Sequence, residues 1–138
     1  MPGPDFLDTN VLVYAYDVTD PAKQHLAQGL VRRAVAGGLI ISTQVLAEFA
    51  ATLLHKIAPA PSSEDVIELL DTLAPIRLIP PDNEIVRRAV EARAAYGLHF
   101  YDGMIVAAAE RAGCERIWSE DFNPRQKYFG ITVANPFH

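Results

Sequence analysis

The sequence FLDTNVLVYAY, residues 6–16, contains the first strand and the first helix that the chain predicts. Its first two residues are apolar and favour a short buried strand. Asp8, Thr9 and Asn10 come next, and side chains of these three types commonly cap the N-terminus of a helix. The apolar run of residues 11–16 then favours the helix itself. The stretch therefore predicts a strand that leads directly into a helix.

The same alternation of strands and helices continues along the chain. Short apolar runs between turn residues predict further strands at residues 39–41, 76–79, 116–118 and 131–133. Apolar residues at helical spacing, preceded by capping residues, predict helices at residues 21–35, 43–57, 62–73, 83–96 and 102–112. Strands that alternate with helices form parallel sheets that are covered on both faces. We therefore expect an α/β fold of three layers around a central parallel sheet of about four to five strands, in a single domain of residues 1–138.

Length and composition exclude several classes of protein. The chain has 138 residues, of which 50% are hydrophobic, so it suffices for one core and not for a multidomain assembly. Its 17 acidic and 12 basic residues give a formal net charge of -5, which excludes a broad basic surface for nucleic acid. Any anionic ligand must therefore be held locally, by a metal ion or by an arginine cluster. Basic residues cluster at residues 32–33, at residues 87–88 and at Arg125 with Lys127, and solvated surface positions are favoured for these clusters over phosphate contacts.

The sequence contains no segment that predicts a membrane span or a secretion signal. Its longest fully apolar runs, residues 11–16 and 104–109, are far shorter than the roughly 18 residues that cross a bilayer. The N-terminus has neither a basic start nor an apolar signal core, and the single cysteine, Cys114, has no disulfide partner within the chain. We therefore expect an intracellular, cytoplasmic protein without a membrane partner.

Four acidic residues are expected to meet at one edge of the predicted sheet. The carboxyl ends of parallel strands lie along the same edge, where ligands of α/β folds usually bind. The acids just beyond predicted strands, or in the helices that follow, are Asp8, Glu48, Asp102 and Asp121. Crowded carboxylates repel one another, so the cluster is costly unless protons or cations intervene. Because Mg²⁺ and Mn²⁺ prefer oxygen ligands, a divalent cation would relieve this repulsion.

A structural role is also open for each of these acids. Asp8 and Asp102 are suited to capping a helix or to interacting with its dipole. Glu48 lies off the centre of the apolar stripe of its helix, as a solvated glutamate would. Asp121 suits a loop turn. The apolar neighbours of Asp102 favour a ligand role for that residue, because an unpaired charge among them would be costly.

Five motifs resemble those of the PIN-domain ribonucleases, and more narrowly those of the VapC toxins of bacterial and archaeal toxin–antitoxin pairs. They are FLDTNVL at residues 6–12, QVLAEF at 44–49, FYDGMIVAAA at 100–109, SEDF at 119–122 and VANPF at 133–137. The first and the third are the most specific, and together the five cover nearly the whole chain. In the fourth, the Ser-x-Asp spacing favours Asp121 over Glu120. His99 departs from the pattern, since many relatives carry a hydroxyl residue as the cap before the third acid.

The resemblance implies a PIN-like fold and metal-dependent endonucleolytic cleavage of RNA. It places the acidic site on Asp8, Glu48, Asp102 and Asp121. One or two Mg²⁺ or Mn²⁺ ions are implied, with Asp8 and Asp102 as the first candidates for direct ligands. Glu48 or Asp121 would orient the attacking water as a base or through a second ion, and the sequence does not separate these roles. Three polar side chains near the acids are expected to hydrogen-bond the carboxylates or the phosphate: Thr9, Asn10 and Ser119. For Thr9, helix capping is the favoured alternative.

The same resemblance implies three partners for the chain. These are an RNA substrate, a cognate VapB-like antitoxin that neutralises the site, and a second copy of the chain. An apolar patch on the helices after Ala58 is a candidate homodimer interface. The alternative to an enzyme is a non-catalytic PIN-like binding module whose acidic edge binds a basic peptide.

Two further hypotheses concern residues near the motifs. A phosphatase with an aspartate nucleophile is disfavoured, because its motif needs an Asp-x-Asp spacing, whereas Asp5 and Asp8 lie three residues apart. Three aromatic residues in or just before the third motif are expected to pack in the core rather than to stack on RNA bases: Tyr96, Phe100 and Tyr101.

Overall fold

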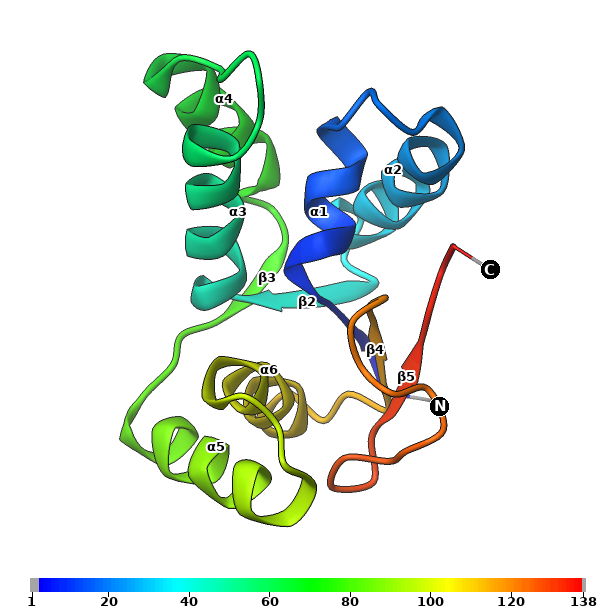
Figure 1. Cartoon of the computed structure of the whole chain (residues 1–138), viewed down its shortest axis with the longest axis vertical. Coiled ribbons are helices and arrows are strands. Elements are labelled where there is room, and N and C mark those ends of the chain that lie inside the picture. Colours follow the sequence, from blue (N-terminus) through cyan, green and yellow to red (C-terminus); the bar gives the residue numbers. More distant parts are fainter. Residues whose placement is uncertain (1–2, 138) are drawn as a thin grey trace.

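The computed structural model describes residues 3–137, so Met1, Pro2 and His138 lie outside the described residues. It contains a 5-stranded sheet in which every pairing is parallel, with the strand order β3-β2-β1-β4-β5 (Figure 1). The strands are β1 (Asp5–Leu7), β2 (Leu39–Ser42), β3 (Arg77–Ile79), β4 (Arg116–Trp118) and β5 (Thr132–Ala134). The predicted α/β fold with a central parallel sheet is therefore confirmed.

Helices cover both faces of this sheet. They are α1 (Thr9–Tyr16), α2 (Pro21–Val35), α3 (Thr43–His55), α4 (Ser63–Leu73), α5 (Asn83–Tyr96) and α6 (Phe100–Arg111). In Figure 1, α1 to α4 lie on one side of the sheet and α5 and α6 on the other, which gives the three expected layers. Within residues 3–137, every helix falls short of the length and hydropathy that a membrane crossing requires.

Capping side chains make α1 and α3 begin where β1 and β2 end. Asp8 directly follows β1, and its Oδ1 accepts a hydrogen bond from the backbone N–H of Thr9 at 2.7 Å. Ser42 is the last residue of β2, and its Oγ accepts from the N–H of Val45 at 3.2 Å. Because these connections are so short, the first turns of both helices lie at the carboxyl edge of the sheet.

The start of α6 differs slightly from the prediction. The helix begins at Phe100 rather than at Asp102, because Nδ1 of His99 accepts a hydrogen bond from the N–H of Tyr101 at 3.3 Å. A histidine ring nitrogen thus performs the capping role for which a hydroxyl residue is expected. Asp102 consequently lies within the first turn of the helix instead of preceding it.

The body of α6 is the buried helix that its apolar sequence predicts. Residues 103–109 are all buried, between the sheet and α5. A Cβ atom on Gly103 would lie 2.7 Å from the carbonyl oxygen of Ala89 in α5, closer than such atoms approach. Glycine at this position therefore allows the two helices to pack closely, which holds the first turn of α6 in place.

Candidate active site

Asp8 is the most buried carboxylate of the site, with only 5% of its surface exposed. It lies at the centre of the sheet edge, where its backbone N–H donates to the carbonyl of Trp118 in β4 at 3.0 Å. Its carboxylate accepts hydrogen bonds from the Thr9 N–H at 2.7 Å and from Ser119 Oγ at 2.7 Å. Burial raises the pKa of Asp8 from 3.8 to about 7, and the nearby carboxylates of Asp121 and Asp102 add to the rise. A cation next to Asp8 would therefore be stabilised strongly.

Asp102 shares this electrostatic environment. It is half-buried in the first turn of α6, and burial is the largest cause of its raised pKa. The negative charges of Asp121 and Glu48 raise this pKa further, whereas His99 lowers it. Since charges act on one another in this way only at short range, Asp8 at the junction of β1 and α1 meets acids from α3, α6 and the loop after β4 at one centre.

Glu48 is held at this centre by two side chains. Its Oε2 accepts a hydrogen bond from Thr9 Oγ1 at 2.8 Å, and its Oε1 accepts from Gln44 Nε2 at 2.8 Å. Gln44 Nε2 also donates to the backbone carbonyl of Tyr101 at 2.9 Å, so it joins α3 to the start of α6. Gln44 is a residue of the site that was not predicted from the sequence. Its position one helical turn before Glu48, on the same helix face, is the signal that could have found it.

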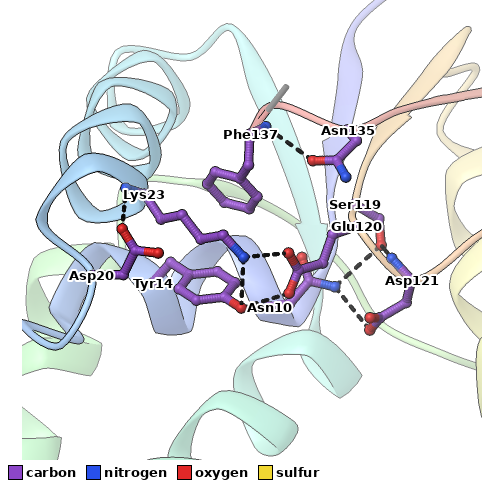
Figure 2. Close-up of polar contacts among 9 residues, drawn as sticks. All are labelled: Asn10, Tyr14, Asp20, Lys23, Ser119, Glu120, Asp121, Asn135 and Phe137. Carbon is purple, nitrogen blue, oxygen red and sulfur yellow. Dashed lines mark hydrogen bonds and ion pairs between the residues drawn. The ribbon is translucent and has the colours of Figure 1, made fainter.

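The structure separates the two adjacent acids of the loop after β4. Asp121 accepts a hydrogen bond from Asn10 Nδ2 at 2.9 Å, and its backbone N–H donates to Ser119 Oγ at 3.1 Å. Glu120 turns the other way, toward Tyr14 (Figure 2). Asp121 rather than Glu120 therefore joins the acidic centre.

Asn10 connects three of the polar side chains. Its Nδ2 lies 2.9 Å from Oδ2 of Asp121, 3.1 Å from Oγ of Ser119 and 3.4 Å from Oδ2 of Asp8. Its Oδ1 is buried and has no hydrogen-bond partner within residues 3–137. A buried amide oxygen without a partner is costly, so a donor or a cation at this position would be favourable. Thr9, Asn10 and Ser119 all donate hydrogen bonds to carboxylates of the centre.

The polar residues of this centre suit a cation such as Mg²⁺ that keeps several waters, better than an ion coordinated by protein ligands alone. Within residues 3–137, no group of three or more His, Cys, Asp or Glu side chains has the spacing of a ready-made metal site. The centre nevertheless offers carboxylate and amide oxygens. Among the described residues, His99 near Asp102 is the one group that offsets the negative charge of the two carboxyls whose pKa is raised, Asp8 and Asp102. Mg²⁺ is usually held by one or two carboxylates and several waters. Asp8 and Asp102 suit such a site.

A family model for the PIN domain matches residues 6–130 of the sequence. The chain belongs to the PIN-domain family. No curated protein sequence matches it.

Solved structures with the same PIN fold include toxin–antitoxin proteins. FitAcB from Neisseria gonorrhoeae has a TM-score of 0.67 and 18% sequence identity, over 97% of this chain and 99% of that chain. VapC20 from Mycobacterium tuberculosis, described as a sarcin-ricin loop cleaving toxin, has a TM-score of 0.68 and 16% identity, over 85% of this chain and 91% of that chain. DNA-bound VapBC from Salmonella typhimurium has a TM-score of 0.69 and 16% identity, over 97% and 98%. At these identities the likeness is one of fold.

A cleft of about 430 Å³ opens beside the acidic centre of this PIN domain. Thr9, Asn10, Glu48 and Asp121 line one end. The other end reaches along α3 to the side chains of its last turn and C-cap: Thr52, His55 and Lys56. The cleft gives an extended ligand access to Glu48 and Asp121.

The aromatic residues near the third motif divide into two groups. Tyr96 and Phe100 pack against the core, as expected. Tyr101 does not, since 56% of its surface is exposed, so the prediction that it packs in the core is wrong. Among the aromatic residues described, the ring of Tyr101 contacts only the neighbouring rings of His99 and Phe100.

Two other hypotheses receive structural answers. Asp5 accepts a hydrogen bond from Trp118 Nε1 at 3.0 Å, which engages it in the sheet instead of beside Asp8. Arg88 is not on a solvated helix face, because its Nε and Nη2 both donate to the carboxylate of Glu110, at 2.8 and 2.9 Å. The guanidinium also lies 3.5 Å from the ring centroid of Phe129. Arg88 is thus used in packing the PIN domain and is not available for phosphate.

Proposed function

We propose that this PIN domain is a VapC-like toxin, an endoribonuclease that uses Mg²⁺ or Mn²⁺ to hydrolyse RNA phosphodiester bonds. One observation carries the proposal. Four acids from separate segments converge at the carboxyl edge of the sheet, and burial raises the pKa of the central one, Asp8. A nuclease needs such a centre in order to hold a cation against the phosphate.

Each polar residue of the centre has a distinct part in this proposal. Asp8 and Asp102 would hold the cation, which supplies positive charge to the scissile phosphate and lowers the pKa of a bound water. Ser119 and Asn10 keep the carboxylates of Asp8 and Asp121 oriented through the hydrogen bonds described above. Thr9 orients Glu48 in the same way.

Two acids can accept the proton that the attacking water releases. Both oxygens of Glu48 already accept a hydrogen bond, from Thr9 and from Gln44. Within residues 3–137, the carboxylate of Asp121 accepts a side-chain hydrogen bond at Oδ2 alone, from Asn10, and Asp121 lines the cleft, so its Oδ1 can accept a proton from water. Asp121 therefore suits the role of general base, and Glu48 suits that of a second anchor for the cation.

An antitoxin partner is part of the proposal. The structural neighbours include a toxin–antitoxin complex from Klebsiella pneumoniae and DNA-bound VapBC2 from Rickettsia felis, which supports a VapB-like antitoxin for this chain as well. A basic side chain of that antitoxin would be attracted by the acidic centre and would compete with the cation and RNA. For the expected homodimer, α4 exposes Ile67, and α5 exposes Val86 and Val90 on adjacent turns.

Cleavage of RNA by the purified protein tests the proposal. Wild type should cut structured RNA when Mg²⁺ or Mn²⁺ is present and should stop when the metal is chelated. Asp8→Asn and Asp102→Asn should remove the activity while the fold is kept, as checked by circular dichroism. The matched control is Asp71→Asn, an exposed acid on α4, which should cut like wild type. If no RNA in a diverse pool is cut, the alternative is favoured, a non-catalytic module whose acidic edge binds a basic peptide.

A further inference from the structure

A second polar cluster lies at the loop that follows β4, where Glu120 points toward Tyr14 and Lys23 while Asp121 points toward Asn10 (Figure 2). The carboxylate of Glu120 accepts a hydrogen bond from Tyr14 Oη at 2.6 Å and another from Lys23 Nζ at 3.0 Å. Lys23 Nζ also donates to Tyr14 Oη at 3.3 Å. These contacts join α1 and α2 to the loop, although Lys23 and Glu120 lie 97 residues apart in the sequence.

Aromatic rings fix the lysine of this cluster in place. Its ammonium lies 4.6 Å from the ring centroid of Tyr14 and 5.3 Å from that of Phe137. The two rings pack edge to face, with their centroids 4.9 Å apart (Figure 2). The side chain of Lys23 is 32% exposed, and pairs this exposed contribute little to stability. The hydrogen bonds and ring contacts of Lys23 therefore indicate that it fixes the position of Glu120 rather than adding to stability.

The geometry that the cluster controls is that of the acidic centre. Glu120 lies between Ser119, which donates to Asp8, and Asp121, which accepts from Asn10. A constraint on the Glu120 side chain limits the backbone on both sides of it. The ion pair with Lys23 also neutralises the carboxylate of Glu120 and turns it away from the other acids.

We propose that Lys23 and Tyr14 are positioning residues, which hold Glu120 and thereby set Ser119 and Asp121 in the acidic centre. The proposal rests on the proposed function, since it assigns these residues to a cation-binding centre. Neither residue touches the acids of that centre in the described structure. Both act through the loop.

Titration of Mn²⁺ alone into Lys23→Met tests the proposal by the sign of the change. Loss of a nearby positive charge would by itself tighten the binding of a cation. Loss of positioning should instead weaken Mn²⁺ affinity, by about five- to tenfold. Lys23→Arg keeps the cation and should restore most of the affinity. Lys127→Met removes the same charge from an exposed loop and should leave the affinity near that of wild type.

Tyr14→Phe provides a second test without a change of charge. It removes the 2.6 Å hydrogen bond to Glu120 and keeps the ring beside Lys23. Exchange of the Asp121 amide proton, followed in metal-free protein, should become at least about threefold faster in this variant and in Lys23→Met, because the contact to Ser119 Oγ loosens.

The outcomes separate this inference from the proposed function. The inference is overturned if both variants fold, exchange the Asp121 amide at the wild-type rate and bind Mn²⁺ as tightly as wild type or more tightly. If wild type itself binds no Mn²⁺, the proposed function fails, and amide exchange in the metal-free protein still decides whether Lys23 and Tyr14 hold the loop.

Discussion

Replacement of Asp8 by asparagine should stabilise the metal-free protein at neutral pH. Burial raises the pKa of Asp8 from 3.8 to about 7, which corresponds to about 4 kcal/mol for ionising the group in the folded protein. In the unfolded chain the carboxyl ionises near pH 4, whereas the folded protein keeps the proton until about pH 7. The contribution of Asp8 to stability is therefore complete below about pH 4 and is lost as the pH rises to about 7.

The asparagine side chain of the Asp8→Asn variant has no charge to bury, so the effect of the substitution should depend on pH. Near pH 4 the variant and wild type should have similar free energies of unfolding, because Asp8 is then protonated when folded. Near pH 8 the Asp8→Asn protein should be more stable by about 2 to 4 kcal/mol, the lower value allowing for weaker hydrogen bonds from Thr9 and Ser119.

Urea denaturation with a metal chelator measures this difference, with the fluorescence of the single tryptophan, Trp118 in β4, as the signal. The control Asp71→Asn replaces an exposed acid and should change the free energy of unfolding by no more than about 0.5 kcal/mol at either pH. Equal or lower stability of Asp8→Asn near pH 8, with an unchanged dependence on pH, would refute the reasoning, because the folded protein would then bear the ionised carboxylate without cost.

Two further predictions concern the groups that hold the site. Gln44→Leu should lower kcat for RNA cleavage about tenfold with little change in KM, because Glu48 loses the hydrogen bond that orients it and RNA contacts are kept. The control Gln28→Leu removes a glutamine whose side chain bonds a backbone carbonyl, and it should leave both constants unchanged. A change in KM alone for Gln44→Leu would count against the role of Gln44 in orienting Glu48. Gly103→Ala should lower the free energy of unfolding by about 1 to 3 kcal/mol, measured by urea denaturation, since its Cβ would lie 2.7 Å from the carbonyl oxygen of Ala89. Unchanged stability would mean that α5 and α6 are not in close contact there.

The strands and helices could be predicted from the sequence because their signals are local. Two apolar residues followed by Asp8, Thr9 and Asn10 specify a strand and a capped helix with no information from elsewhere in the chain. The parallel sheet then follows from the alternation of strands and helices, and it brings the strand ends to one edge. This is why Asp8 and Asp121 could be placed together although they lie far apart in the sequence.

The remaining features depend on contacts between distant side chains. The sequence spacing favours Asp121 over Glu120, but the contacts that engage Glu120 elsewhere come from Tyr14 on α1 and Lys23 on α2. Core packing was predicted for Tyr101, and only the packing of α6 shows that its ring is left uncovered. No local pattern carries such information, since it arises when separate helices meet.

The proposed function requires that the acidic centre binds a divalent cation through Asp8 and Asp102. Isothermal titration of Mn²⁺ into folded wild type, Asp102→Ala and the exposed control Asp71→Ala tests it most directly. We predict saturable binding to wild type and to Asp71→Ala, and an affinity at least about tenfold weaker for Asp102→Ala. Equal Mn²⁺ affinity in all three proteins, or no binding to wild type, would contradict the account.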